Sequence, residues 1–210
     1  MVLLEALTFE TLVAFAVTSA LIEMTPGPNM AYLALVAATE GRRAGYAAVA
    51  GVALGLAVVG GLAAVGVAAL ISSSELAYQT LRWGGVVYLL WLAWDGWSGA
   101  AEEIEHAPLG STLWRYFRRG LITNLLNPKA AVFYVAVLPS FLPDTADLSQ
   151  TLTLSAIYVA VATAIHAAIV TLAGAAQAFF DDPVLERRLR RVLSLGLALV
   201  ALWFAVKTAR

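Results

Sequence analysis

The sequence contains no cysteine and few charged residues. Of its 210 residues, 13% are charged and 61% are hydrophobic. The absence of cysteine excludes disulfide bonds, thiol redox chemistry and thiolate metal sites. A net charge of −1 provides no basic surface for nucleic acid. Because soluble domains carry about 25% charged residues, this composition indicates an integral membrane protein.

Sequence signals of enzymes and of secreted proteins are also missing. No glycine-rich phosphate loop ending in Gly-Lys-Ser/Thr occurs, so the chain cannot drive transport by its own ATP hydrolysis. No nucleophile stands beside a base, and we expect neither an enzyme nor a cofactor nor a metal site. The N-terminus has no positive region, and no cleavage motif follows the first apolar segment. We therefore expect a retained membrane anchor and not a signal peptide.

Six apolar segments reach or approach the ~20 residues that a membrane-spanning helix needs. They are Phe9–Ala38, Tyr46–Ile71, Leu81–Trp97, Tyr116–Leu142, Leu152–Phe179 and Val192–Val206. We predict one all-α membrane domain, residues 1–210, with two three-helix repeats. The repeats would be residues 9–97 and 116–207, joined by a cytoplasmic linker, residues 98–115. Because each repeat has an odd number of spans, the two copies would cross the membrane in opposite directions, as an inverted repeat.

The arginine residues predict the orientation, because cytoplasmic loops carry an excess of Arg and Lys. The loops after the first, third and fifth segments share one side of the membrane and carry nine arginines, Arg42, Arg43, Arg115, Arg118, Arg119, Arg187, Arg188, Arg190 and Arg191. We expect that side to be cytoplasmic and both termini to lie outside. The run Glu186–Arg191 is predicted to be a solvated linker on the cytoplasmic side.

Proline interrupts the first and fourth segments at matching places, and the first helix of each repeat is predicted to be broken there. The breaks are Thr25-Pro26-Gly27-Pro28-Asn29 and Asn124-Leu125-Leu126-Asn127-Pro128-Lys129. Hydrocarbon has no water for freed backbone groups, so breaks occur where protein or a polar cavity binds those groups. Paired breaks in corresponding halves are the best sequence indicator of a transporter binding site. The alternative is two structural kinks without a ligand.

The residues of the breaks suit a zwitterion. Pro28 and Pro128 are each predicted to begin a half-helix, because proline is tolerated at the first helical position. Gly27 is predicted to adopt a positive φ. The N–H groups of a helix start attract a carboxylate, and the carbonyls that end the preceding half-helix attract an ammonium. The amides of Asn124 and Asn127, like nearby Asn29, would either contact the substrate or cap the broken helices.

Two ionisable residues are predicted to meet near mid-membrane. At ~1.5 Å per residue, Glu23 lies ~20 Å from the outer end of its segment and Lys129 lies ~20 Å from the cytoplasmic end of its own. In a core ~30 Å thick, each residue is therefore within about 5 Å of the middle. Charge at this depth costs at least ~2.5 kcal/mol, which favours a functional role over a structural ion pair. His166 is either a proton relay with Glu23 or a hydrogen-bonding residue between helices.

The glycines of the second segment predict close helix packing. Gly51 and Gly55 are four residues apart and form a small surface that lets another helix approach. The pattern is weakly specific, and we expect it to serve packing within the chain.

Four segments together carry a family resemblance. They are Glu23-Met24-Thr25-Pro26-Gly27-Pro28-Asn29-Met30, Gly41-Arg42-Arg43-Ala44-Gly45, Tyr88-Leu89-Leu90-Trp91-Leu92-Ala93-Trp94 and Gly120-Leu121-Ile122-Thr123-Asn124-Leu125-Leu126-Asn127-Pro128-Lys129-Ala130-Ala131. The chain resembles the lysine-exporter (LysE-type) family, which includes homoserine and threonine efflux proteins, over roughly residues 9–206. The resemblance implies a bacterial inner-membrane protein that exports amino acids using the proton-motive force.

The family motifs also indicate site residues. The Pro-Gly-Pro-Asn/Asp motif falls on Pro26, Gly27, Pro28 and Asn29, and the Asn-Leu-Leu-Asn-Pro-Lys motif falls on Asn124, Asn127, Pro128 and Lys129. Asn29 stands where many members have Asp. If an acidic group near the first break carries the proton or the ammonium, Glu23 would serve instead.

These observations together predict an efflux carrier for small neutral amino acids resembling homoserine, threonine or leucine, working by proton antiport and alternating access. One alternative is export of metal ions or other small solutes, although the scarcity of Cys and His argues against soft-metal ligation. Another is a non-transporting membrane scaffold, which would have a filled core at the breaks and no polar cavity. The expected partners are an amino acid, protons and the lipid bilayer. A homodimer is compatible with the sequence, which does not set the oligomeric state.

Overall fold

A computed structural model describes residues 7–25, 27–66, 74–98, 109–143, 146–177 and 183–207. Pro26, one of the predicted site residues, lies outside these ranges. All regular elements of the described residues are helical: α1 (Phe9–Glu23), α2 (Pro28–Ala64), α4 (Glu75–Trp97), α5 (Leu109–Leu125), α6 (Pro128–Val132), the π-helical η2 (Phe133–Val137), the 3₁₀-helical η3 (Leu138–Phe141), α7 (Leu148–Gln177) and α8 (Pro183–Lys207).

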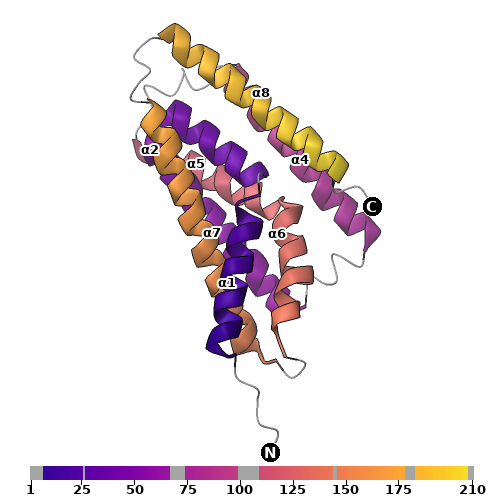
Figure 1. The fold of residues 1–210 in the computed structure, drawn as a ribbon. Helices are drawn as coiled ribbons and strands as arrows, with labels where there is room; N and C mark the ends of the chain where they lie inside the picture. Colours follow the sequence, from indigo (N-terminus) through magenta and orange to yellow (C-terminus); the bar gives the residue numbers. More distant parts are fainter. Residues whose placement is uncertain are drawn as a thin grey trace, which may run out of the picture.

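The long helix α2 contains a sharp turn at Gly41. The backbone there has φ 86° and ψ 170°, a conformation that is nearly exclusive to glycine. A Cβ at Gly45 would lie 3.1 Å from the Cβ of Ala37, so the segments on either side of the turn pack against each other. Figure 1 shows the first segment leaving the centre of the molecule and the second returning past it. The predicted loop at Arg42 is therefore a turn inside one element.

Fewer helices of the structure are long and apolar enough to cross a membrane than the six spans that the sequence predicts. Among the described residues, two helices could cross a membrane, residues 28–64 and 148–175. A third candidate joins residues 112–125 and 129–141, which are bent by 50°. Helix α1 has only 15 residues because the break ends it, and charged residues interrupt α4 and α8. The helices thus have the character of membrane spans, while the arrangement of six spans in inverted repeats stays a prediction.

The two predicted breaks meet at the centre of the molecule. Helix α1 ends where α2 begins, and α5 ends where α6 begins. Helix α1 comes from the end of the bundle that carries the N-terminus, and α5 comes from the opposite end (Figure 1). The hydrogen bond between Asn29 and Asn124 joins the two breaks directly.

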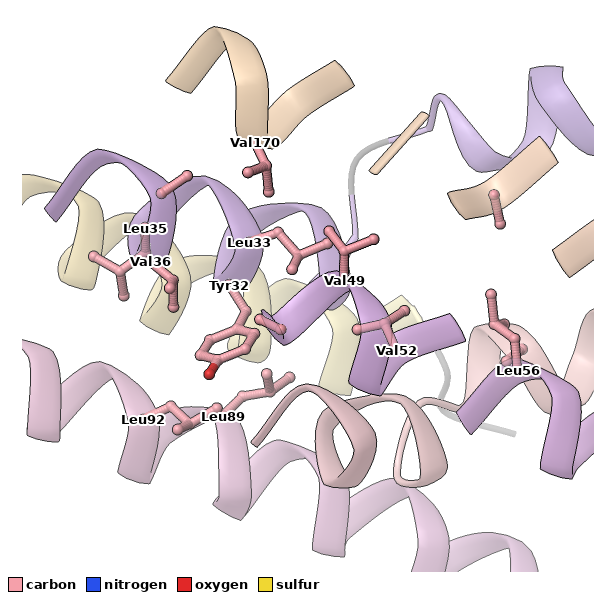
Figure 2. Close-up of a cluster of buried hydrophobic side chains, with 14 of the residues drawn as sticks. Tyr32, Leu33, Leu35, Val36, Val49, Val52, Leu56, Leu89, Leu92 and Val170 are labelled. Atoms are coloured by element: carbon pink, nitrogen blue, oxygen red, sulfur yellow. The ribbon is translucent and has the colours of Figure 1, made fainter. Parts of the chain in front are cut away.

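The core lies where α2 contacts α5 and α7. Figure 2 shows side chains of α2, including Leu33 and Val52, gathered with Leu89 of α4 and Val170 of α7. The predicted glycine surface is part of this packing. A Cβ at Gly51 would lie 2.0 Å from the carbonyl oxygen of Phe117, so only glycine lets the two backbones approach this closely.

Two predicted linkers overlap helices in the structure. Helix α5 begins at Leu109, inside the segment 98–115, whose residues 99–108 lie outside the described ranges. The run Glu186–Arg191 is part of α8, which begins at Pro183. Proline at a helix start and several Leu and Arg residues favour this helix. Arg190 also pairs with Glu40, so the run is tied to α2.

Candidate functional site

Gly27, in the first break, has an extended backbone and not a positive φ. Gly27 has φ −164° and ψ 177°, so the prediction for this residue is wrong. The physical reason is Pro28, which disfavours the helical region for the residue before it. Pro28 begins α2 as predicted. The space beside Gly27 is bounded by Lys129, whose Cδ would lie 3.6 Å from an added Cβ.

A lysine from the other half of the chain occupies the carbonyl end of the first break. The Lys129 Nζ donates to the Thr25 carbonyl oxygen over 3.1 Å. The sequence predicts that the carbonyls ending this half-helix attract an ammonium, and in the structure that ammonium belongs to the protein itself.

The second break is capped by its own asparagine. Helix α5 ends at Leu125 and α6 begins at Pro128, as the proline predicts. The Asn127 Oδ1 accepts a hydrogen bond from the Lys129 N–H over 3.1 Å. This is the N-cap arrangement, which binds one of the free N–H groups of a helix start. Of the two roles predicted for Asn127, the structure therefore shows capping.

Two buried amides connect the breaks and keep unused polar atoms. Asn29 Nδ2 donates to Asn124 Oδ1 over 2.9 Å, and both side chains are buried. The Asn29 Oδ1 and the Asn124 Nδ2 have no hydrogen-bond partner among the described residues. A buried polar atom without a partner costs about 1–3 kcal/mol. The pair thus presents one acceptor and one donor that a ligand could use.

Glu23 is the centre of a buried polar cluster. Its side chain is within 3.8 Å of the Lys129 Nζ, so the two residues predicted to be neighbours do lie together. The Nε2 of His166 lies 2.9 Å from Glu23 Oε1, and the Tyr158 hydroxyl donates to Oε2 over 3.2 Å. Glu23 is 3% exposed and His166 is 0% exposed. One carboxylate therefore meets an ammonium, an imidazole and a phenol inside an apolar bundle.

Both roles predicted for His166 stay predictions. Its Nε2 lies at ion-pair distance from the Glu23 Oε1, which brings α7 to α1. Neither of its ring nitrogens has a hydrogen-bond partner among the described residues. The buried hydroxyls of Ser19 and Thr163 are likewise without a described partner. Unused polar atoms thus lie on both helices that hold the cluster.

The sequence interpretation missed Tyr158, Ser19 and Thr163. Helical spacing was the available signal: Ser19 precedes Glu23 by four residues, and Thr163 precedes His166 by three, so each pair shares a helix face. Tyr158 precedes His166 by eight residues, about two turns. Because α7 is apolar around its circumference, the pattern of hydrophobic residues could not indicate which face points inward.

A chain of aromatic contacts runs from the Glu23 cluster, through Phe133 and Phe15, to a cavity between α1 and η3. The cavity has a volume of about 730 Å³ and lies between α1 and η3, with Glu10 and Phe141 among its lining residues. The Phe15 ring packs edge-on against Phe141, with centroids 5.2 Å apart. The Phe133 ring stacks on Tyr158 at 3.7 Å. Aromatic contacts thus connect the cavity wall to a partner of Glu23.

Neither described cavity is lined by Glu23, Asn127 or Lys129. The polar cavity that the carrier prediction places there is not among them, since these side chains contact one another and the surrounding backbone. The described residues also contain no group of three His, Asp or Glu side chains placed to hold a metal ion.

Comparison with known proteins matches most of the chain. A family model described as "LysE type translocator" covers residues 20–210. The chain is 32% identical over 179 residues to a homoserine/homoserine lactone efflux protein of Salmonella typhimurium, covering 84% of this chain and 87% of the relative. It is 35% identical over 138 residues to a leucine efflux protein of Klebsiella pneumoniae, covering 61% of each chain. No solved structure matches the chain.

Proposed function

Because this chain belongs to the family of LysE-type translocators, we propose that it is a secondary transporter that exports small neutral amino acids. The substrate class rests on two relatives, named as homoserine and leucine efflux proteins. Homoserine, threonine and leucine are therefore the first substrates to test. The observation that carries the proposal is the contact of Glu23 with Lys129 at the meeting point of two broken helices.

The proposed architecture has six spans arranged as two inverted three-helix repeats in a bacterial inner membrane. Its support is the opposite approach of α1 and α5 to the central breaks (Figure 1). The arginine residues near the Gly41 turn, in the middle of α5 and at the start of α8 lie toward one end of the bundle, here named the arginine end. By the excess of Arg and Lys in cytoplasmic loops, the arginine end would face the cytoplasm and both termini would lie outside.

The polar cluster suggests how an amino acid would bind. Lys129 already contacts Glu23 and the Thr25 carbonyl, which together form a site for an ammonium group. The substrate's ammonium would take that place, and its carboxylate would pair with the displaced Lys129. The unused amide atoms of Asn29 and Asn124 would bind the remaining polar groups. The pair of Glu23 with Lys129 would thus be replaced by two pairs, Glu23 with the substrate's ammonium and Lys129 with its carboxylate. No buried charge would be left without a partner.

Proton coupling follows from competition for one carboxylate. Glu23 is buried, so its carboxylate needs a positive partner, which is Lys129 in the structure and would be the substrate's ammonium or a proton during transport. When the substrate leaves on the outer side, a proton would neutralise Glu23, and His166 at 2.9 Å would pass that proton inward. Rocking of one repeat against the other would expose the site to the two sides in turn.

The experiment is efflux of radiolabelled homoserine, threonine and leucine from proteoliposomes that contain the purified protein. We expect export that speeds up with an imposed proton gradient and stops when an uncoupler dissipates that gradient. Protein-free liposomes provide the control. Efflux that is the same with and without the protein would refute the proposal.

One observation favours a static membrane scaffold instead. No described cavity is lined by the Glu23 cluster, and the cluster's charges already pair with one another. In a scaffold, Glu23 and Lys129 would only hold the two halves together. Substitution of either residue would then change the stability of the protein and leave amino-acid fluxes unaltered.

A further inference from the structure

Ion pairs join the two halves of the chain at the arginine end. The Asp95 Oδ2 of α4 accepts from Arg119 over 2.7 Å and from Arg115 over 3.2 Å, both on α5. The Glu40 Oε1 of α2 lies 2.6 Å from the Arg190 Nη1 of α8. In each pair, the acid precedes residue 98 and the arginine follows residue 108. These contacts therefore bridge the two repeats.

A small cavity lies among these ion pairs. It has a volume of about 30 Å³, and its lining includes all five charged side chains of the pairs together with Tyr32, Val36 and Leu92. A water molecule needs ~10–15 Å³ on this measure, so the cavity holds about two waters. An amino acid would enter only after the ion pairs separate.

Tyr32 contributes an unused hydroxyl to this cavity. Its side chain is 2% exposed, and its hydroxyl has no hydrogen-bond partner among the described residues. Figure 2 shows the ring pointing from α2 toward Leu89 and Leu92 of α4. Most buried hydroxyls are hydrogen-bonded, so this hydroxyl has its donor and acceptor capacity available to a ligand in the cavity.

The first segment of α2 leads from this cavity to the central site. Glu40 lies eight residues, or ~12 Å, beyond Tyr32 along the helix, toward the arginine end. Asn29 lies three residues, or ~4.5 Å, before Tyr32, at the break. The first segment of α2 thus carries Glu40 of the ion pairs, the unpaired hydroxyl of Tyr32 and the amide of Asn29 that joins the two breaks.

We infer that this cavity is a second binding site, a loading site for amino acids that carry both a free ammonium and a free carboxylate. The inference rests on the proposed function and on the arginine end facing the cytoplasm. The substrate's carboxylate would replace Asp95 at Arg119 and Arg115, and its ammonium would pair with Asp95 or Glu40. The Tyr32 hydroxyl would donate to the carboxylate. The substrate would thus separate each acid from its arginine by giving both of them a new partner.

This exchange accounts for selectivity toward zwitterions. A zwitterion restores a partner to both the acid and the arginine that it separates. A molecule without the ammonium or without the carboxylate leaves one charge unpaired in a low-dielectric cavity, which is costly. An amino-acid amide should therefore compete poorly with the parent amino acid at this site.

A unique cysteine provides the first test, because the chain has none of its own. Val36, on the cavity wall, is changed to Cys and treated in inside-out vesicles with a membrane-impermeant thiol reagent. We expect slow labelling, faster labelling when Asp95→Asn is added, and protection by homoserine or leucine but not by leucinamide. Ala14→Cys, in the opposite cavity, is the control and should stay unlabelled from this side.

Tyr32→Phe provides a second test that does not depend on cysteine. The hydroxyl forms no described hydrogen bond, so its removal should leave thermal stability unchanged or raised. If the hydroxyl binds substrate, the apparent KM on the arginine side should rise about fivefold, the effect of one lost hydrogen bond. The maximal rate should change less than the KM. An unchanged KM would refute a binding role for Tyr32.

The outcomes separate this site from the proposed function. If the wild-type protein exports amino acids but no amino acid protects Val36→Cys, the loading site is wrong and the transporter proposal stands. If the wild-type protein exports none of them, the proposed function fails and the loading site fails with it. Protection by the amide equal to that by the amino acid would refute the partner exchange.

Discussion

The Nε2 of His166 lies 2.9 Å from the Oε1 of Glu23, between two helices that lie far apart in the sequence. The imidazole is fully buried, and neither of its nitrogens has a hydrogen-bond partner among the described residues. The same carboxylate is within 3.8 Å of Lys129. A proton on this carboxylate therefore competes with a neighbouring ammonium, which is the property that proton antiport of an amino acid requires.

Glu23→Gln should abolish amino-acid export while the protein stays folded. Glutamine keeps the size of the side chain and can still hydrogen-bond to Tyr158, but it has no charge for an ammonium. We expect a stability loss of about 1–3 kcal/mol, because Lys129 loses its charged partner. Efflux and thermal unfolding in detergent measure the two effects. Exposed Glu10→Gln, on the same helix, is the matched control, and normal export by Glu23→Gln would refute the role.

His166→Gln should separate proton coupling from substrate binding. Glutamine can hydrogen-bond to Glu23 but cannot carry a proton at neutral pH. We expect exchange of labelled for unlabelled substrate to continue without a gradient, while uphill export driven by a pH gradient is lost. Both fluxes are measured in the same proteoliposomes.

Tyr158→Phe is the comparison for that variant. It removes a hydroxyl 3.2 Å from Glu23 and keeps the ring that stacks on Phe133. We expect a stability change near 1 kcal/mol and retained coupling. Uphill export that persists in His166→Gln would show that the histidine only joins the helices.

Gly51→Ala should destabilise the α2–α5 contact. The added Cβ would lie 2.0 Å from the Phe117 carbonyl oxygen, so the backbones must separate. Overpacking of this kind costs about 1–3 kcal/mol. Gly61→Ala, where nothing lies within 4 Å of the added Cβ, should be neutral or stabilise the helix by up to about 1 kcal/mol. Thermal unfolding of both variants in detergent checks this difference, and equal stabilities would contradict the packing.

Asn127→Ala should weaken the start of α6. The Asn127 Oδ1 caps the Lys129 N–H, and loss of an N-cap costs about 1 kcal/mol. Asn127→Ser should restore stability, because serine is a comparable cap. The apparent KM of Asn127→Ser then tests the substrate-binding role: it should rise if the amide also contacts the amino acid. Stability that is the same in the alanine and serine variants would contradict capping.

Local features of the helices were predictable because they depend on residues that are close in sequence. The apolar composition predicts membrane helices, and Pro28 and Pro128 predict helix starts by their missing N–H groups. Two local conformations, by contrast, were predicted wrongly. Gly27 is extended because of the proline that follows, and the run Glu186–Arg191 continues as helix because Pro183 starts α8 and Glu40 supplies a partner for Arg190.

The sequence by itself determined the class of protein, the positions of both breaks and the nearness of Glu23 to Lys129, which follows from depth along two helices. Only the tertiary structure decided that His166 and Tyr158 meet Glu23 and that Asp95 pairs with Arg119. The physical reason is helix rotation. Depth follows from counting residues at a constant rise, whereas the inward face of a helix that is apolar all round is set by its packing against neighbours.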